Sequence, residues 1–521
     1  MQMTRLARGL GILAAVTMAG CKSLDVPNPN QPDARRALAD PSSLEAVTGG
    51  TMRTWMNTLE NNPATVLCTQ ARSCSASWNN DNMNFYSSLD ADGTRLNRPW
   101  QNDPSAAART SVENYWFGFY AALSSANDVL KAVRQNGVVI GDAAQTKRSE
   151  TVAQLMQAAA IAELALQYDK GYVVFDSTDL TVPLVYADRK KMRDAALAKL
   201  DAAIALAGAN TFTTPAGWTN GRVYDNLQIA KIANTMAARL LANWPRNAAE
   251  NAQVPWARVV SYASKGLSTG TPFDFMFVGD GCTAWCPEML TWFDDMTSGR
   301  VSTRIANMMD PVTQKDPWPA GGNSQPKSAD KRLGNGTFGN ADMVKGYGNI
   351  PKDAGAGTDF AFSSQAGFRP SRGSYHQSNI AHTRWDCTGL DDLTSIGSGF
   401  CAFPVLMAAQ NDLLWAEGLI RSGGDLAQAA TLINNSRVTR GGLPAAAAGD
   451  GVAGLLDKLN YEIEVELFAL NSTSFFLNRR LDKLISGTPH EMPVPAKELD
   501  VFGQALYTYG GRGLLNAPTP P

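Results

Sequence analysis

One segment constrains the fold more than any other, because it keeps a helical spacing of apolar residues over several turns. In DNLQIAKIANTMAARLLANWP, residues 225–245, apolar side chains recur three and four positions apart until Pro245 ends the run. The stripe consists of Ile229, Ile232, Ala233, Met236, Ala237, Leu240 and Leu241. This pattern predicts an amphipathic helix that must bury one face against another helix.

Further segments look like partners for such a helix. VPWARVVSYASKGL, residues 254–267, is expected to pair with it in antiparallel fashion. Similar Ala-rich pairs occur at 144–168 with 189–207, and at 403–422 with 425–438. Alanine lets helices approach closely, as stacked pairs in a tetratricopeptide-like solenoid require, although no strict repeat of about 34 residues is visible. The sequence therefore predicts a mainly α fold built on a tetratricopeptide-like helical-pair scaffold.

Two earlier helices have clear signals of their own. Asp40 followed by Pro41 is an N-cap with proline at the first helical position. Residues 111–137 form a second helical pattern that ends at Gly137. Its stripe is made of Trp116, Phe119, Tyr120, Leu123, Ala126, Asn127 and Leu130.

Between residues 268 and 400 the pattern changes, because Gly, Pro, Ser, Asn and Asp interrupt it every few residues. No helical stripe persists there. Long irregular segments inside a compact protein are usually functional or disordered. Cysteines within and beside this region favour order, so we expect a long loop-rich region.

The N-terminus has the features of an export signal. Arg5 and Arg8 precede a short apolar run, residues 10–18, that is too short to span a bilayer. Small residues then stand directly before Cys21, as in a bacterial lipobox, which predicts a signal peptide at 1–20 and lipidation of Cys21. The Pro- and Asn-rich residues 21–40 would form an extended tether. The alternatives are an ordinary cleaved signal with a chance cysteine, or a buried helix.

Composition narrows the class of protein. Hydrophobic residues make up 44% of the chain and charged residues 18%, which is typical of a globular protein. No later segment offers the roughly 20 unbroken apolar residues of a membrane helix, so the lipid would be the only membrane anchor. Without residues 1–20 the chain has 44 basic and 48 acidic residues, a net charge of about −4. Because this balance gives no positive field, nucleic acid is not expected as a partner.

Six cysteines remain after Cys21, and they fall into three couples that are local in sequence. The couples are Cys68 with Cys74, Cys282 with Cys286, and Cys387 with Cys401. An even count in an exported protein favours disulfides, although the sequence leaves their connectivity open. A zinc site at CTAWC is the competing interpretation. The chain has only three histidines, His376, His382 and His490, and none lies near that motif, so we expect no metal.

Aromatic residues suggest where a ligand would bind. Trp55, Trp116, Trp244, Trp256 and Trp415 lie on helical stripes or at helix ends, where core packing is the usual role. Seven others stand in loop-like sequence rich in Asn, Asp and Gly: Trp78, Trp100, Trp218, Trp285, Trp292, Trp318 and Trp385. A flat ring beside amide and carboxylate groups can stack on a sugar while its hydroxyls are hydrogen-bonded. Equally, these rings can pin long loops onto the scaffold.

Signals for catalysis are weak. The pairs Asp294–Asp295 and Asp391–Asp392 are adjacent in sequence, so nothing fixes the carboxyl separation of roughly 5–9 Å that glycosidases use. No HExxH or Walker motif occurs. We therefore expect no catalytic residue and a protein that binds rather than converts.

Several motifs together resemble the SusD/RagB family of outer-membrane nutrient-binding lipoproteins. They are LDVPNPNQP after the lipobox, ENYWFGFYAALSSANDVL with Asn127, LLWAEGLIRSGGDLAQAATLINNSRVTRGGLP, EIEVELFALNSTSFFLNRRL, MPVPAKEL and YTYGG. The third motif matches through Glu417, Gly424, Ala429, Ile433, Asn434, Arg437, Gly441, Gly442 and Leu443. The fourth departs from the family pattern at Ile463, at Leu470 and Asn471, and at Leu477 and Asn478. Its apolar spacing is kept, but whether a polar network persists at that corner is left open.

The resemblance implies one SusD-like domain over residues 21–521. Its parts would be the tether, a helical scaffold at 41–267, a ligand-facing loop region at 268–400 and closing helical pairs at 401–521. It further implies a lipid-anchored, surface-facing outer-membrane protein that passes an oligosaccharide, or a peptide, to a SusC-like TonB-dependent transporter. Binding would be noncovalent and need no cofactor, with a structural calcium ion as an option. The alternatives are a helical-repeat scaffold for protein interactions and an exported glycoside hydrolase.

Overall fold

Helices make up most of the fold. The computed structural model describes residues 39–76, 79–87, 98–270, 272–293, 299–317, 323–335, 357–362, 378–385 and 399–511. The N-terminal helices are α3 (Pro41–Leu59), α4 (Asn62–Gln70), α5 (Thr110–Arg134), α6 (Ala143–Gln167), α7 (Arg189–Ala209), α8 (Asn226–Asn243), α9 (Ala248–Asn251) and α10 (Trp256–Ala263). The later helices are α11 (Glu288–Phe293), α12 (Thr303–Met309), α13 (Ala408–Ser422), α14 (Leu426–Arg437), α15 (Gly451–Glu466), α16 (Thr473–Arg480) and α17 (Ala496–Val501).

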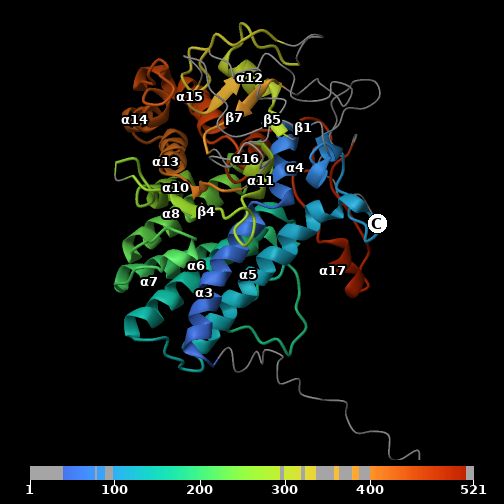
Figure 1. The fold of residues 1–521 in the computed structure, drawn as a ribbon, viewed down its shortest axis with the longest axis vertical. Helices are drawn as coiled ribbons and strands as arrows, with labels where there is room; N and C mark the ends of the chain where they lie inside the picture. The colour runs from blue at the N-terminus through green and yellow to red at the C-terminus, as the bar shows by residue number, and fades with distance from the viewer. Residues whose placement is uncertain are drawn as a thin grey trace, which may run out of the picture.

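Successive helices pack against each other as pairs, as the sequence predicted. Helices α3, α5, α6 and α7 lie side by side in the lower half of the molecule (Figure 1). Helix α8 packs on both α7 and α10, and α13 packs on α14. The structure thus confirms the mainly α, tetratricopeptide-like scaffold.

Helix α6 is the centre of this scaffold. Every residue from Ser149 to Gln167 is buried, so the helix is enclosed on all sides. Six of these residues are alanines: Ala153, Ala158, Ala159, Ala160, Ala162 and Ala165. Because alanine adds little bulk, neighbouring helices can approach α6 from several directions.

Capping residues are found at the helix ends, as the sequence predicted for Asp40. Asp40 caps α3, with its carboxylate accepting a hydrogen bond of 2.8 Å from the backbone N–H of Ser43. Asp225 and Gln228 form a capping box at the start of α8. At the other end of a helix, Gly423 closes α13 with φ +73°, a left-handed conformation that glycine adopts without strain.

One predicted boundary is wrong. The helix expected over 403–422 begins only at Ala408, because Ala402–Leu406 form strand β8. This strand pairs antiparallel with β4 (Phe275–Val278), and Pro404 cannot sit in a helix interior without breaking its hydrogen bonds. A strand partner more than a hundred residues away decides the conformation here.

Short elements hold the loop-rich region together. The strands are β1 (Cys74–Ala76), β2 (Lys170–Gly171), β3 (Ala187–Asp188), β5 (Gly299–Val301), β6 (Phe360–Phe362) and β7 (Ile380–His382), besides β4 and β8. They form antiparallel pairs, β1 with β5, β2 with β3, β4 with β8 and β6 with β7. Several of these strand pairs join segments that lie far apart in sequence. The pairing therefore ties the described parts of the loop-rich region to other parts of the fold.

A search of the described residues for a helix both long and apolar enough to cross a membrane finds none.

Candidate functional site

Two disulfides staple local turns, as the cysteine couples predicted. Cys68 at the end of α4 is bonded to Cys74 at the start of β1, and Cys282 is bonded to Cys286 in the loop before α11. Cys401 is disulfide-bonded as well, and its predicted partner Cys387 lies outside the described residues.

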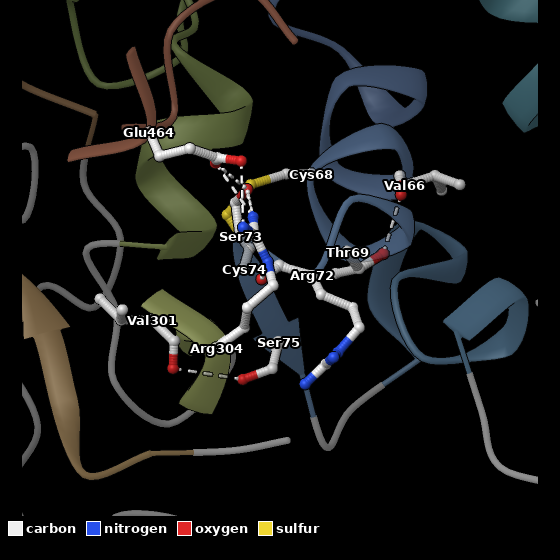
Figure 2. Close-up of a disulfide and its surroundings, with 10 residues drawn as sticks. All are labelled: Val66, Cys68, Thr69, Arg72, Ser73, Cys74, Ser75, Val301, Arg304 and Glu464. Atoms are coloured by element: carbon white, nitrogen blue, oxygen red, sulfur yellow. Dashed lines mark hydrogen bonds and ion pairs between the residues drawn. A yellow bond between two sulfur atoms is a disulfide. The ribbon is translucent and has the colours of Figure 1, made fainter. Parts of the chain in front are cut away.

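The first disulfide stands beside an ion pair that links three elements. Figure 2 shows Arg304 of α12 reaching Glu464 of α15 and the hydroxyl of Ser73, next to the Cys68–Cys74 bond. Both guanidinium Nη atoms lie 3.0 Å from a Glu464 oxygen, and Nη2 donates to Ser73 at 3.1 Å. The turn between α4 and β1 is therefore fixed covalently and electrostatically to the C-terminal helices.

A larger buried network occupies the corner formed by the EIEVELFALNSTSFFLNRRL motif. Arg332 lies within 2.7–3.1 Å of carboxylate oxygens of Asp330, Glu462 and Glu466, and all four side chains are fully buried. Arg384 and Arg440 also pair with Glu466, each at 2.9 Å. A polar network therefore does persist at this corner. It clamps residues of the loop-rich region onto α15.

The predicted tryptophans fall into different environments. Trp100, Trp218 and Trp285 are buried, with exposed fractions of 2%, 5% and 6%. Trp100 donates its indole N–H to the Glu491 carbonyl at 2.9 Å, and the ring of Trp285 packs 5.5 Å from that of Phe277. These three rings pack against the protein itself and offer little surface to a ligand.

Two of the predicted loop tryptophans keep part of their surface exposed. Trp292 lies on α11, and Trp385 packs under the guanidinium of Arg384 at 4.5 Å. Trp78 and Trp318 lie outside the described residues. Of the predicted loop tryptophans that the structure describes, only Trp292 and Trp385 thus keep part of the ring exposed.

A polar hollow of about 460 Å³ opens on the surface between α3 and α5. Its lining consists of Thr54, Asn57, Thr58, Asn61, Asn114 and Phe117. The Phe117 side chain is 43% exposed, so an aromatic face stands beside three amide groups and two hydroxyls. Figure 1 shows α3 and α5 side by side, with α11 close to the end of α3 that leads into α4.

Local structure explains why these side chains converge. Thr54, Asn57, Thr58 and Asn61 stand at positions i, i+3, i+4 and i+7, so they share one side of α3 and its end. Asn57 is held by the stapled loop, because its Nδ2 donates to the Ala284 carbonyl at 2.8 Å and its Oδ1 accepts from Cys286 N–H at 3.1 Å. The second disulfide thus supports one wall of the hollow.

Sequence reasoning missed this hollow, although one signal was present. Asn114 and Phe117 lie within the predicted helix 111–137 but outside its apolar stripe. An aromatic ring outside the apolar stripe of a helix faces solvent, where a ligand can reach it. The asparagines of α3 gave no comparable signal.

Three carboxyl groups lie behind the hollow. Glu60 is 2% exposed, and burial, with a smaller contribution from Glu288, raises its pKa to about 8. Burial also raises the pKa of Glu288 to about 8, followed by the charge of Asp81 in the short η1 helix (Asn80–Asn82). Within the described ranges no group of acidic, His or Cys side chains is arranged to hold a metal ion.

A smaller hollow of about 250 Å³ lies between α5 and the segment 172–184. Asn127, part of the motif from the sequence, donates to the Val174 carbonyl at 3.1 Å there. Tyr120 donates its hydroxyl to the Tyr172 carbonyl at 3.0 Å. These polar groups are thus engaged in holding the segment onto α5.

Comparison with known proteins identifies the fold. No protein-family model matches the chain, and no curated protein does. A SusD superfamily protein from Parabacteroides distasonis is 14% identical, with a TM-score of 0.59 over 88% of this chain and 97% of its own. A SusD-like carbohydrate binding protein from Bacteroides fragilis is also 14% identical, with a TM-score of 0.53 over 85% and 86%. A crystal structure with xylogluco-oligosaccharide reaches 0.50 at 14% identity, over 92% of both chains. The chain has the SusD-like fold that the sequence resemblance implied.

Proposed function

We propose that this protein is an outer-membrane lipoprotein of the SusD family that binds an oligosaccharide in the hollow between α3 and α5. It passes that ligand to a SusC-like TonB-dependent transporter and does not convert it. The fold is that of SusD-like proteins, one of which is a carbohydrate binding protein, and another similar structure is a complex with xylogluco-oligosaccharide.

The observation that carries the proposal is the chemistry of the hollow. Asn57, Asn61 and Asn114 each donate one N–H to a protein oxygen, which leaves the second N–H of each amide for a ligand. The Asn114 oxygen and the threonine hydroxyls add acceptors. The exposed Phe117 ring offers the apolar face on which a sugar ring stacks. Because the lining carries no charged side chain, a neutral glycan suits it better than a charged one.

Trp292 is the predicted tryptophan best placed to extend this site. It stands on α11, whose first turn contacts the end of α3, since Met289 N–H donates to the Glu60 carbonyl at 2.9 Å. We include Trp385 as a second candidate, because its ring is also partly exposed.

Features of the sequence support the two other steps of the proposal. The lipobox supports the lipid anchor, and the resemblance to the SusD/RagB family supports delivery to a transporter. Cys21 follows a lipobox-like signal, and about 20 residues separate it from the start of α3. An extended chain of that length reaches about 65 Å, which lets the body sit above a membrane-embedded barrel.

Calorimetric titration tests the binding step. The mature chain is titrated with neutral oligosaccharides, xylogluco-oligosaccharide among them, and with short peptides. We expect binding of at least one neutral glycan, and about fivefold weaker binding for Phe117→Ala, because stacking and burial of one ring face is worth about 1 kcal/mol. Phe502→Ala is the matched control, since this phenylalanine is 57% exposed and does not line the hollow. Absence of glycan binding, or equal effects of both variants, contradicts the proposed site.

Envelope experiments test the other steps. Mass spectrometry of natively expressed protein should find a lipid on Cys21, and a Cys21→Ser variant should be released from the membrane. Mild detergent extraction should recover the lipidated protein together with a barrel protein. An unmodified Cys21 contradicts the anchor, and recovery without any barrel contradicts the delivery step.

A further inference from the structure

Glu288, the first residue of α11, connects the hollow to two other parts of the site. Its Oε2 atom accepts a hydrogen bond of 2.7 Å from Nδ2 of Asn61. Trp292 stands four residues later on the same side of α11, and its side chain hydrogen-bonds to Glu288. The carboxyl group of Asp81 in η1 also lies near Glu288, and burial together with the charge of Asp81 raises the pKa of Glu288.

The bond to Asn61 fixes a chain of amide orientations. Because Nδ2 of Asn61 faces the carboxyl group, its Oδ1 is free to accept, and it accepts from Nδ2 of Asn114 at 2.6 Å. Asn114 lines the hollow, and no described residue donates to its Oδ1 atom. The chain from Glu288 through Asn61 therefore ends on an oxygen that needs a hydrogen-bond donor.

We propose, building on the proposed function, that Glu288 is a positioning residue of the glycan site. It orients the amides of Asn61 and Asn114 so that the Asn114 oxygen accepts a hydrogen bond from a sugar hydroxyl, and it aligns Trp292 beside them. The site then selects a ligand that presents a hydroxyl donor at this point, and a sugar that lacks this hydroxyl leaves the Asn114 oxygen unpaired.

A proton holds this arrangement in place. Two carboxyl groups that are buried close together repel each other unless one of them is protonated. The titratable groups that face Glu288 are Asp81 from η1 and Glu60 from the end of α3, both acids. Burial and Asp81 raise the pKa of Glu288 to about 8, so this proton is present at neutral pH. Above that pH two carboxylates face each other, and their repulsion separates α11 from η1.

Two substitutions of Glu288 distinguish a role in orienting the amides from a role in packing alone. Glutamine is the neutral isostere of the protonated acid, because it can accept from Asn61 and carries no charge beside Asp81. With xylogluco-oligosaccharide as the probe, wild-type affinity should fall about tenfold between pH 6.5 and 9.5, the effect of about one hydrogen bond. Glu288→Gln should bind equally well at both pH values, and Glu288→Ala should bind about tenfold more weakly at both. Asp457→Asn, at an exposed acid on α15, is the control.

A ligand-free measurement keeps this inference separate from glycan binding. Side-chain amide NMR signals of Asn61 and Asn114, assigned by their alanine variants in ¹⁵N-Asn-labelled protein, should shift together with a midpoint near pH 8. They should not titrate in Glu288→Gln. If these signals titrate but no oligosaccharide binds, the positioning role stands and the glycan function fails. The positioning role is overturned if the amide signals of the wild type do not change with pH. It is also overturned if Glu288→Gln and Glu288→Ala lose the same affinity for the oligosaccharide.

Discussion

Glu417 on α13 and Arg480 on α16 form a buried, bidentate ion pair that joins the two C-terminal sequence motifs. Nη1 and Nη2 of Arg480 lie 2.5 and 2.6 Å from the two carboxylate oxygens of Glu417, and both side chains are almost completely buried. Arg421, one turn along α13, adds a third contact of 2.7 Å. The pair shows why both motifs occur in one chain, since each supplies the charge that the other buries.

Removing one partner of this pair should destabilise the fold strongly. Glu417→Ala leaves Arg480 buried without its carboxylate, so we expect a loss of about 3–5 kcal/mol in the free energy of unfolding. Burial raises the pKa of Glu417, but Arg480 and Arg421 outweigh it and hold the pKa below its ordinary value. The pair therefore stabilises the fold above about pH 4.5, and this contribution is lost as pH falls through the lowered pKa.

Urea unfolding followed by circular dichroism measures this effect. Asp457→Asn on α15 is the control, because that acid is exposed and should change the free energy of unfolding by less than about 0.5 kcal/mol. A loss below about 1 kcal/mol for Glu417→Ala is incompatible with a desolvated pair.

The predicted tryptophans should separate into two classes. Trp218 is 5% exposed and packs against Gly49 and the guanidinium of Arg148, so Trp218→Ala should cost about 3–5 kcal/mol in stability. Trp292 is only partly buried, so Trp292→Ala should cost about 1 kcal/mol and weaken glycan binding by about tenfold. Thermal unfolding and calorimetric titration of both variants check this, and a reversed order of the two effects contradicts the assignment.

The two described disulfides should also differ in what they support. Each closes a loop of a few residues, so loop-closure entropy predicts a loss of about 2 kcal/mol when either cysteine couple is replaced by serines. Only the Cys282–Cys286 bond borders the hollow, because Asn57 is held by Ala284 and Cys286. We therefore expect weaker glycan binding for the Cys282/Cys286 double variant alone.

Titration of both double variants, with unfolding measured alongside, distinguishes the two bonds. The Cys68/Cys74 variant is the matched control, since it loses a bond of the same kind away from the hollow. Equal affinities for the two variants mean that the stapled loop does not shape the site.

Local patterns predicted the scaffold because helices are local structures. The stripe through Ile229 and Leu240 and the cap at Asp225 need no distant information, and α8 forms where they placed a helix. The segment starting at residue 403 was assigned wrongly, because pairing with Phe275–Val278 overrides its local helical pattern. The buried contacts of Arg332 with Glu462 and Glu466 bridge segments about 130 residues apart, and no spacing rule connects them.

The candidate site was less predictable than the fold, because it depends on contacts between residues far apart in sequence. Loop tryptophans were a reasonable expectation, but burial of Trp100, Trp218 and Trp285 depends on tertiary packing that composition does not encode. Phe117 could have been found as an aromatic outside its helix stripe. Asn61 and Asn114 become a pair only when α3 and α5 lie side by side.

Glu60 should make the stability of the protein fall as pH rises. Its side chain is buried, its Oε2 atom lacks a hydrogen-bond partner within the described residues, and burial followed by Glu288 raises its pKa to about 8. The folded protein therefore holds a proton here that the unfolded chain releases near pH 4.5. Stability from this group is complete below pH 4.5 and declines as pH rises to 8, with a slope of about 1.4 kcal/mol per pH unit. Glu60→Gln removes this titration, so the difference in unfolding free energy between variant and wild type should grow in favour of the variant from pH 5 to pH 8. Urea unfolding at several pH values measures that difference, with Asp457→Asn as the control. A constant difference over this range would mean that the Glu60 carboxyl ionises at its ordinary pKa.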